Sequence, residues 1–239
     1  ARAALEQLYS TGELIIHHKK GARKFYDLAE KYLPRTLLAA PDPFPEDAAH
    51  QRWRMLRRIG AVGLMWNRPS DAWLGIPGLK ADQRKDAFRK LMEEGKLCEV
   101  SVEGMREMLY CLAEDVFLLE EVRQERVPGG KRCELLAPLD CLLWDRRLIR
   151  ELFGFDYTWE IYTTQPKRKY GFYVLPLLYG DSFAGRVEAV AGGDRCLLVK
   201  HIWLEEGVRR TKAFDAALER CFRRFAAFNG CSRTVCPQG

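Results

Sequence analysis

Apolar and polar residues follow the same pattern twice in the first half of the chain, at an offset of 83 to 84 residues. Each copy reads as a helix that stops at a glycine, followed by two strands with a turn between them. The equivalent positions are Leu5, Leu8 and Gly12 in the first copy, Phe88, Leu91 and Gly95 in the second, and the stretches 26–30 and 110–114. A helix that leads directly into a two-stranded hairpin is typical of the second half of a winged helix.

The second copy also carries the helices that precede such a hairpin. Residues 50–65 are predicted to form a first helix, residues 71–74 a short second helix and residues 81–94 a third. The face of the first helix that we expect to be buried carries Trp53, Leu56, Gly60 and Leu64. We therefore predict a partial winged helix with a proline-rich linker over residues 1–45, and a complete winged helix over residues 46–130.

Beyond Val127-Pro128-Gly129-Gly130 the pattern changes to apolar runs that are typical of strands. The predicted strands cover residues 133–136, 158–163, 170–178, 182–190 and 196–204, and the predicted helices cover 145–153 and 212–228. A hairpin signal at residues 179–181 favours antiparallel pairing. The last helix carries a stripe that we expect in the core, made of Phe214, Leu218, Cys221, Phe225 and Phe228. We predict that residues 131–239 form a C-terminal antiparallel strand-rich domain with a terminal helix, and that the fold class is α+β.

The net charge of the chain is modest, but the basic residues are unevenly distributed. Lysine and arginine number 39 against 33 aspartate and glutamate residues, a net charge of +6, and residues 50–96 alone carry an excess of the same size. Concentrated positive charge suits a polyanion, because neutralising phosphates releases bound counterions. The alternative is a set of solvated faces without a ligand. The candidate DNA-binding residues are Lys19, Lys20, Arg23, Lys24, Lys85, Arg89, Lys90, Lys167, Arg168, Lys169 and Tyr170.

The sequence predicts no metal, cofactor or disulfide. The eight cysteines include no Cys-x-x-Cys pair and the four histidines complete no zinc pattern, so we expect reduced thiols. The sequence contains no phosphate-binding loop that would indicate a nucleotide cofactor, and no apolar run is long enough to span a membrane. Asp140 and Asp145 flank Trp144 and have the residue types of an acid–base pair. A helix cap at Asp145 and a loop anchor at Asp140 are the simpler interpretation.

Several stretches of the sequence are similar to one protein family. They are residues 57–61, 73–75, 136–140, 142–146, 153–157, 167–176, 185–188 and 203–207. Together they resemble the YcaQ/AlkZ-like DNA glycosylases over nearly the whole chain, although Cys141 stands where the family usually has proline. The resemblance implies tandem winged helices and a strand-rich domain curved around double-stranded DNA, in a cytoplasmic protein bound to the bacterial nucleoid while it acts. The implied reaction is hydrolysis of the N-glycosidic bond of N7-alkylated guanine, including guanine in interstrand crosslinks.

The resemblance assigns no catalytic residue to this chain. The family signature is Gln, an apolar residue, then Asp or Gln, and it belongs to the family's N-terminal winged helix. The residues two places after the glutamines are Tyr9, Trp53, Lys85, Arg126 and Lys167, and Gln238 has none. Because the first residues read like the interior of a helix, we expect the later part of a longer protein, inactive by itself. Two alternatives stay open: a non-catalytic winged-helix DNA-binding or regulatory protein, and a winged-helix protein-interaction scaffold.

Overall fold

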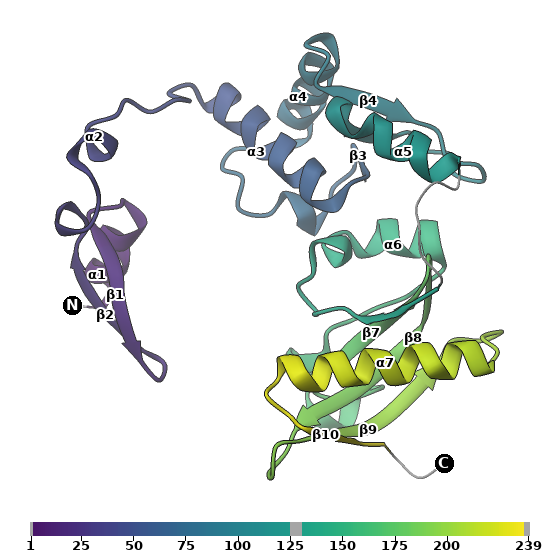
Figure 1. The fold of residues 1–239 in the computed structure, drawn as a ribbon. Coiled ribbons are helices and arrows are strands. Elements are labelled where there is room, and N and C mark those ends of the chain that lie inside the picture. Colours follow the sequence, from purple (N-terminus) through teal and green to yellow (C-terminus); the bar gives the residue numbers. More distant parts are fainter. Residues whose placement is uncertain (1, 125–130, 237–239) are drawn as a thin grey trace. The chain divides into compact units, whose positions relative to one another are not determined.

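The computed structural model describes residues 2–124 and 131–236 of the chain (Figure 1). Helices and strands both contribute to it, which confirms the α+β class. The chain divides into two compact units, Ala1–Glu46 and Asp47–Gly239. Within the described residues, no helix combines the length and the apolar character needed to cross a membrane.

The first unit is a helix and an antiparallel hairpin, followed by short helical turns. Its elements are α1 (Arg2–Ser10), β1 (Leu14–Lys20), β2 (Arg23–Leu28), the 3-10 helix η1 (Ala29–Lys31) and α2 (Arg35–Leu38). The two strands confirm the predicted hairpin, which turns at Gly21 with a φ of +60°. Among residues 2–46 only Leu14 and Ala29 are buried, so this unit has a small core.

The second unit begins with a larger version of the same arrangement. Its elements are α3 (Asp47–Val62), β3 (Met65–Trp66), η2 (Asp71–Trp73), α4 (Ala81–Glu93), β4 (Leu97–Val100), β5 (Leu109–Leu112), η3 (Ala113–Asp115) and α5 (Val116–Arg123). The strands form one antiparallel sheet in the order β3-β5-β4. The predicted first helix ran to Met65, but α3 ends at Val62 because Gly63, with a φ of +92°, turns the chain into β3.

Backbone hydrogen bonds confirm the internal repeat. In each copy a glycine with a positive φ ends the helix, +85° at Gly12 and +66° at Gly95, a conformation that other residues rarely adopt. Equivalent N–H groups then donate to equivalent carbonyls at 2.9 to 3.0 Å: Glu13 to Leu8, Lys96 to Leu91, Ala29 to Glu13 and Ala113 to Lys96. The two stretches therefore have the same local structure at the helix end and at the base of the hairpin.

A five-stranded sheet makes up most of the rest of the second unit. Its strands are β6 (Cys133–Leu135), β7 (Val174–Tyr179), β8 (Ser182–Ala191), β9 (Cys196–Leu204) and β10 (Arg233–Val235), in the order β10-β9-β8-β7-β6. The helices are η4 (Cys141–Leu143), α6 (Arg146–Phe153), η5 (Glu160–Tyr162), η6 (Gln165–Lys167) and α7 (Lys212–Phe228). Helix α7 lies across one face of the sheet (Figure 1), where Phe214 and Leu218 pack against Val187 and Val199.

Helix α6 contributes to two hydrophobic cores. Leu148 is 2% exposed and packs in one cluster with Met55 and Ile59 of α3. Ile149, the next residue, packs in another cluster with Phe183 of β8. Two adjacent positions of one short helix therefore connect the second copy of the repeat to the sheet.

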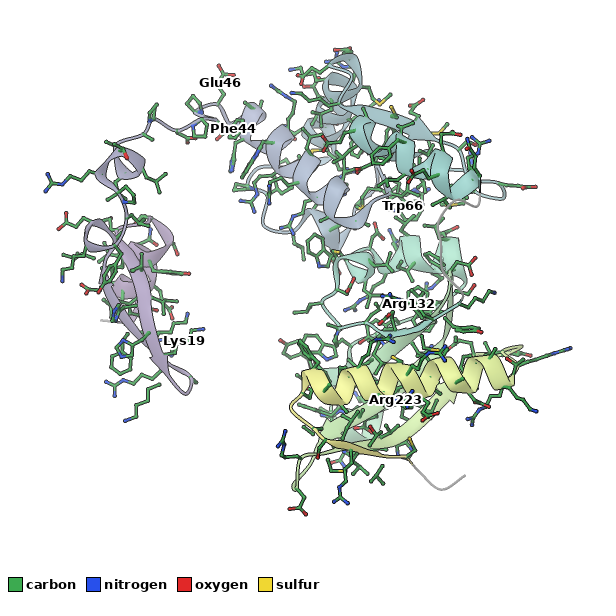
Figure 2. The ribbon with its side chains drawn as sticks, in the orientation of Figure 1. Lys19, Phe44, Glu46, Trp66, Arg132 and Arg223 are labelled. Carbon is green, nitrogen blue, oxygen red and sulfur yellow. The ribbon has the colours of Figure 1, made fainter. Side chains whose placement is uncertain are left out.

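A buried carboxylate holds the start of helix α6. One oxygen of Asp145 accepts the backbone N–H of Leu148 at 3.0 Å, and the other accepts the indole N–H of Trp66 at 2.6 Å (Trp66 is labelled in Figure 2). Asp145 and Trp66 are each 2% exposed. The predicted helix cap is confirmed, and the same side chain also fixes α6 against strand β3.

The structure corrects the predicted C-terminal domain in two ways. Strand β10 pairs parallel with β9, so the sheet is mixed rather than antiparallel throughout, and α7 is not the terminal element. The chain returns to the sheet because Gly230, with a φ of +70°, ends the helix and Ser232 donates its N–H to the carbonyl of Arg195 at 2.7 Å. Residues 158–163, predicted as a strand, hold the 3-10 helix η5, because the Glu160 side chain binds backbone groups of a neighbouring loop.

Two predicted helix faces are wrong in part. Helix α3 buries Gln51, Met55 and Ile59, whereas Trp53 is 38% exposed and Gly60 is exposed, because the contacts with α4 and α6 lie along the first stripe. In α7 the predicted residue Phe228 is 86% exposed. The smaller Ala226 and Cys231 take the positions in the core at that end of the helix.

Candidate nucleic-acid interface

Four of the predicted DNA-binding cations lie opposite one another on hairpin β1–β2. Lys19 pairs across the strands with Lys24, and Lys20 with Arg23, and all four residues are exposed (Lys19 is labelled in Figure 2). Like charges directly opposite each other destabilise an antiparallel pair. Because a bound polyanion would relieve this repulsion, the arrangement indicates a polyanionic ligand.

Aromatic rings accompany this charge on the hairpin. The His18 ring stacks on Phe25 with a centroid distance of 4.3 Å, and the Arg23 guanidinium lies 5.2 Å from the same centroid. Nδ1 of His17 is 2.9 Å from Nδ1 of His18, so one of the two rings donates a hydrogen bond to the other. The hairpin thus presents cations together with planar polar rings, the side-chain types that contact phosphates and sugars.

The cations of helix α4 differ in how far acidic neighbours already neutralise them. Arg89 forms ion pairs with Asp86 and, at 2.7 Å, with Glu93, and Lys90 lies 3.1 Å from Asp86. The Arg89 hydrogen bond holds the pKa of Asp86 below its usual value, so this carboxylate stays ionised. Lys85 is exposed and makes no ion pair with any residue that the structure describes. Lys85 is therefore the cation of this group that is most available to a phosphate.

The third cluster lies on a loop whose shape is set by a buried carboxylate. Glu160, 9% exposed, accepts backbone N–H bonds from Lys169 at 2.7 Å, Tyr170 at 2.8 Å and Gly171 at 3.1 Å. Burial raises the pKa of Glu160, but the three hydrogen bonds and the charge of Arg168 outweigh it and lower the pKa overall. The loop is therefore held by an ionised side chain.

The side chains of this loop divide into exposed and anchored groups. Lys167 and Lys169 are exposed, whereas Arg168 and Tyr170 are half-buried. Arg168 donates through Nε to the carbonyl of Thr163 at 2.8 Å, and its guanidinium lies 5.0 Å from the ring centre of Phe172. The ammonium group of Lys169 lies 5.0 Å from the ring centre of Tyr170. The loop therefore presents two exposed lysines beside a fixed guanidinium.

A buried arginine connects the loop to the sheet. The guanidinium of Arg186 in β8, 4% exposed, lies 4.2 Å from the ring centre of Tyr170 and 4.7 Å from that of Phe155. Nη2 donates to Glu205 at 2.6 Å and Nη1 to the carbonyl of Asp156 at 3.2 Å. Its Nε is buried without a partner among the residues of the described ranges. Arg186 therefore fixes Tyr170 by stacking on it and is itself fixed by an ion pair.

Three stretches that carry the family resemblance meet at this arginine. Tyr170, Arg186 and Glu205 belong to residues 167–176, 185–188 and 203–207, and the Trp203 ring lies 5.4 Å from that of Tyr170. Arg186 and Glu205 are not among the residues predicted from the sequence to bind DNA. The available signal was a cation among the apolar residues Phe183, Ala184 and Val187 of a predicted strand, since a buried cation needs a partner.

The three predicted clusters are distinct groups of residues. Within each cluster the residues are neighbours, and no hydrogen bond or ion pair among residues 47–124 and 131–236 joins the cluster of helix α4 to that of the loop. The hairpin cluster belongs to the first compact unit, and the other two belong to the second. Each cluster must therefore be tested by its own variants.

The remaining candidate groups have structural roles. No set of three or more His, Cys, Asp and Glu side chains within the described ranges is placed to hold a metal ion. All eight cysteines are free, and burial raises the pKa of Cys133 and Cys221 to about 11, so these two thiols stay protonated at neutral pH. Asp140 accepts the N–H of Leu142 at 3.0 Å, which confirms the predicted loop anchor.

We expect the contribution of the Glu160 carboxylate to the free energy of unfolding to depend on pH. Because its pKa is lowered in the folded state, the contribution is fully present above the unfolded pKa and is lost as the pH falls below about 4. We expect Glu160→Gln to lower the free energy of unfolding by about 1–3 kcal/mol at pH 7 and by much less at pH 3. Urea unfolding at both pH values measures the difference. An equal loss at both would mean that the charge of Glu160 does not contribute.

Comparison with known families places these observations in context. The chain matches the family model described as "DNA glycosylase AlkZ-like" over residues 1–228. No solved structure is significantly similar to the chain. The matched range includes both copies of the repeat, the loop held by Glu160 and the cluster around Arg186. The chain therefore belongs to the AlkZ-like family of DNA glycosylases.

Proposed function

We propose that this chain binds damaged double-stranded DNA in an enzyme that hydrolyses the N-glycosidic bond of N7-alkylguanine, including guanine in interstrand crosslinks. The family match over residues 1–228 carries the proposal. The like-charged pairs on hairpin β1–β2 support a polyanionic ligand, since like charges directly opposite each other destabilise the strand pair until a polyanion neutralises them. The free cysteines are consistent with the cytoplasm as its location.

Alkylation at N7 suits a protein whose main task is to hold the lesion. The added positive charge makes the base a good leaving group, so that less chemical assistance is needed. The enzyme must position one water and stabilise the sugar cation that develops as the bond breaks. None of the six glutamines of this chain begins the family's Gln-apolar-Asp/Gln signature. The residues that we assign are therefore DNA-binding residues.

We propose that both copies of the repeat are winged-helix modules. In the second copy three helical segments, α3, η2 and α4, precede hairpin β4–β5, and β3 adds a third strand to it. This order supports a complete winged helix, and the shared hydrogen bonds support the same assignment for the first copy. In such modules the third helix enters a DNA groove, which gives Lys85 of α4 a phosphate contact.

The ion pairs of α4 predict unequal effects of its cations on DNA binding. Lys85→Ala and Lys169→Ala should each reduce the slope of log affinity against log salt by about one, because each removes one phosphate contact. Arg89→Ala should change the slope by clearly less, since Arg89 is already paired with Asp86 and Glu93. Fluorescence anisotropy with a duplex between about 50 and 200 mM salt measures the slopes. Wild-type slopes for both lysine variants would place the DNA surface elsewhere.

The proposed substrate is tested by binding and base release in one sample. We expect the chain to bind an N7-methylated duplex more tightly than an unmodified duplex, in a salt-dependent manner. Release of N7-methylguanine under single-turnover conditions then reports whether these residues also perform the chemistry. Equal affinity for both duplexes, without release, would refute the proposed substrate.

A non-catalytic DNA-binding or regulatory protein is the second candidate. The observation that favours it is that no glutamine of the chain fits the catalytic signature. This alternative predicts a preferred, palindromic DNA sequence bound by a dimer, with no preference for alkylated bases. Selection of bound sequences from a random duplex library distinguishes the two candidates.

A further inference from the structure

We infer that the loop around Glu160 is a platform that stacks the bases of an unpaired DNA strand, with Tyr162 and Phe172 as the stacking rings. The inference rests on the proposed DNA-binding function and adds the strand state that this surface recognises. It concerns bases whose faces are free, which a continuous duplex does not offer.

The first observation is the exposure of the two rings. Tyr162 is 88% exposed and Phe172 is 49% exposed. Arg168 lies between their segments: its guanidinium is 5.0 Å from the ring centre of Phe172, and its Nε bonds to the carbonyl of Thr163, which follows Tyr162. Aromatic rings beside an arginine are the side chains on which nucleobases stack without regard to sequence.

The second observation is that one carboxylate anchors the segments of both rings. Glu160 belongs to the same 3-10 helix as Tyr162, and it accepts the N–H of Gly171, the residue before Phe172. The backbone positions of both rings are therefore fixed before a ligand arrives. A surface that is ordered in advance loses less conformational entropy on binding than a flexible one.

The third observation is the charge of the segment. Lys167 and Lys169 are exposed on either side of Arg168, and Glu160 is the only acidic residue between Tyr157 and Gly180. Because Glu160 is occupied by three backbone N–H groups, it does not oppose a phosphate at the surface. Exposed lysines beside exposed rings match a strand that alternates phosphates and bases.

The exposed rings also favour unpaired DNA over paired DNA as the ligand of this surface. In a duplex each base face is covered by its neighbour, so rings on a protein surface gain little from it. In an unpaired strand the faces are free, and each stacked base contributes about 1–3 kcal/mol. An enzyme that opens a damaged duplex would expose such bases beside the lesion.

The test compares single-strand and duplex affinity in ring variants of the full chain. We expect Tyr162→Ala and Phe172→Ala each to weaken binding of a labelled strand of about 12 thymidines by about 5- to 150-fold. Affinity for a blunt duplex of the same length should be unchanged. Phe172→Trp should keep single-strand binding, because the larger ring still stacks. Phe117→Ala, which removes a 59% exposed ring from α5, is the matched control and should change neither affinity.

Two outcomes would overturn the inference: wild-type single-strand affinity in both alanine variants, or an equal loss of duplex affinity. The first would mean that the rings do not stack bases, and the second that they contact DNA irrespective of its strand state. Ring-dependent binding of the single strand, without a preference for alkylated duplex, would instead uphold the platform and refute the proposed substrate.

Discussion

Replacing Arg186 by alanine is expected to lower the free energy of unfolding of the second unit by about 3 kcal/mol. The side chain is 4% exposed, and its removal empties the space between the rings of Phe155 and Tyr170. It also leaves Glu205 without its partner. The expected loss is at the lower end for a broken buried ion pair, because the Glu205 side chain is 34% exposed and regains water.

Thermal unfolding measures this loss, which should lower Tm by about 6–12 °C for a unit of this size. Arg186→Lys is the matched control and should lose about 1–2 kcal/mol, because an ammonium keeps the charge but neither fits flat between two rings nor forms both hydrogen bonds. A variant with alanine at position 186 and an unchanged Tm would show that the stacked arginine does not hold the loop. Binding to the single strand should fall in parallel, since Tyr170 loses its support.

The second large effect is expected at the contact between Asp145 and Trp66. Asp145→Ala removes both the cap of α6 and the acceptor for a buried indole N–H, at a cost of about 2–4 kcal/mol. Trp66→Phe should cost about 1–3 kcal/mol, because it leaves the other half of the contact unpaired and a small void. Urea unfolding of both variants gives the two values.

A double-mutant cycle isolates this contact from the packing around it. If the two side chains act together, the variant with both substitutions should lose clearly less than the sum of the single losses. Additive losses would mean that the hydrogen bond of 2.6 Å contributes nothing beyond the separate roles of the two residues.

The elements that could be predicted from the sequence are those whose pattern is local. Helix α7 has the predicted extent, and hairpin β1–β2 follows the predicted helix and glycine stop, because strand alternation, glycine stops and helical spacing are properties of adjacent residues. The repeat was readable for the same reason. Which face of α3 is buried depends on where α4 and α6 lie, so Met55 and Ile59 could not be preferred over Trp53 from the sequence.

Only the exposed charged residues of the candidate site could be predicted from the sequence. Lys167 and Lys169 are exposed, as a basic run in a turn predicts. The residues that shape the loop, Glu160 and Arg186, act through partners that are nine or more positions away, such as Tyr170 and Glu205. The local pattern predicts that Glu160 belongs to a strand, because nothing near it in the sequence indicates that its carboxylate binds backbone groups of residues 169–171.

Helix α6 has a consequence for how this protein can be divided or recombined. Leu148 belongs to the core of the second repeat copy, and Ile149 belongs to the core that contains Phe183 of the sheet. Either the repeat copy or the sheet, taken without α6, therefore loses part of its hydrophobic core. A chimera joined between residues 124 and 131 would therefore combine the second repeat copy of one parent with helix α6 of the other. Leu148 of that helix would then have to pack against a core from a different protein. Recombination within the family should succeed when residues 47–236 pass as a single inherited block, with crossovers tolerated at the boundary near Glu46.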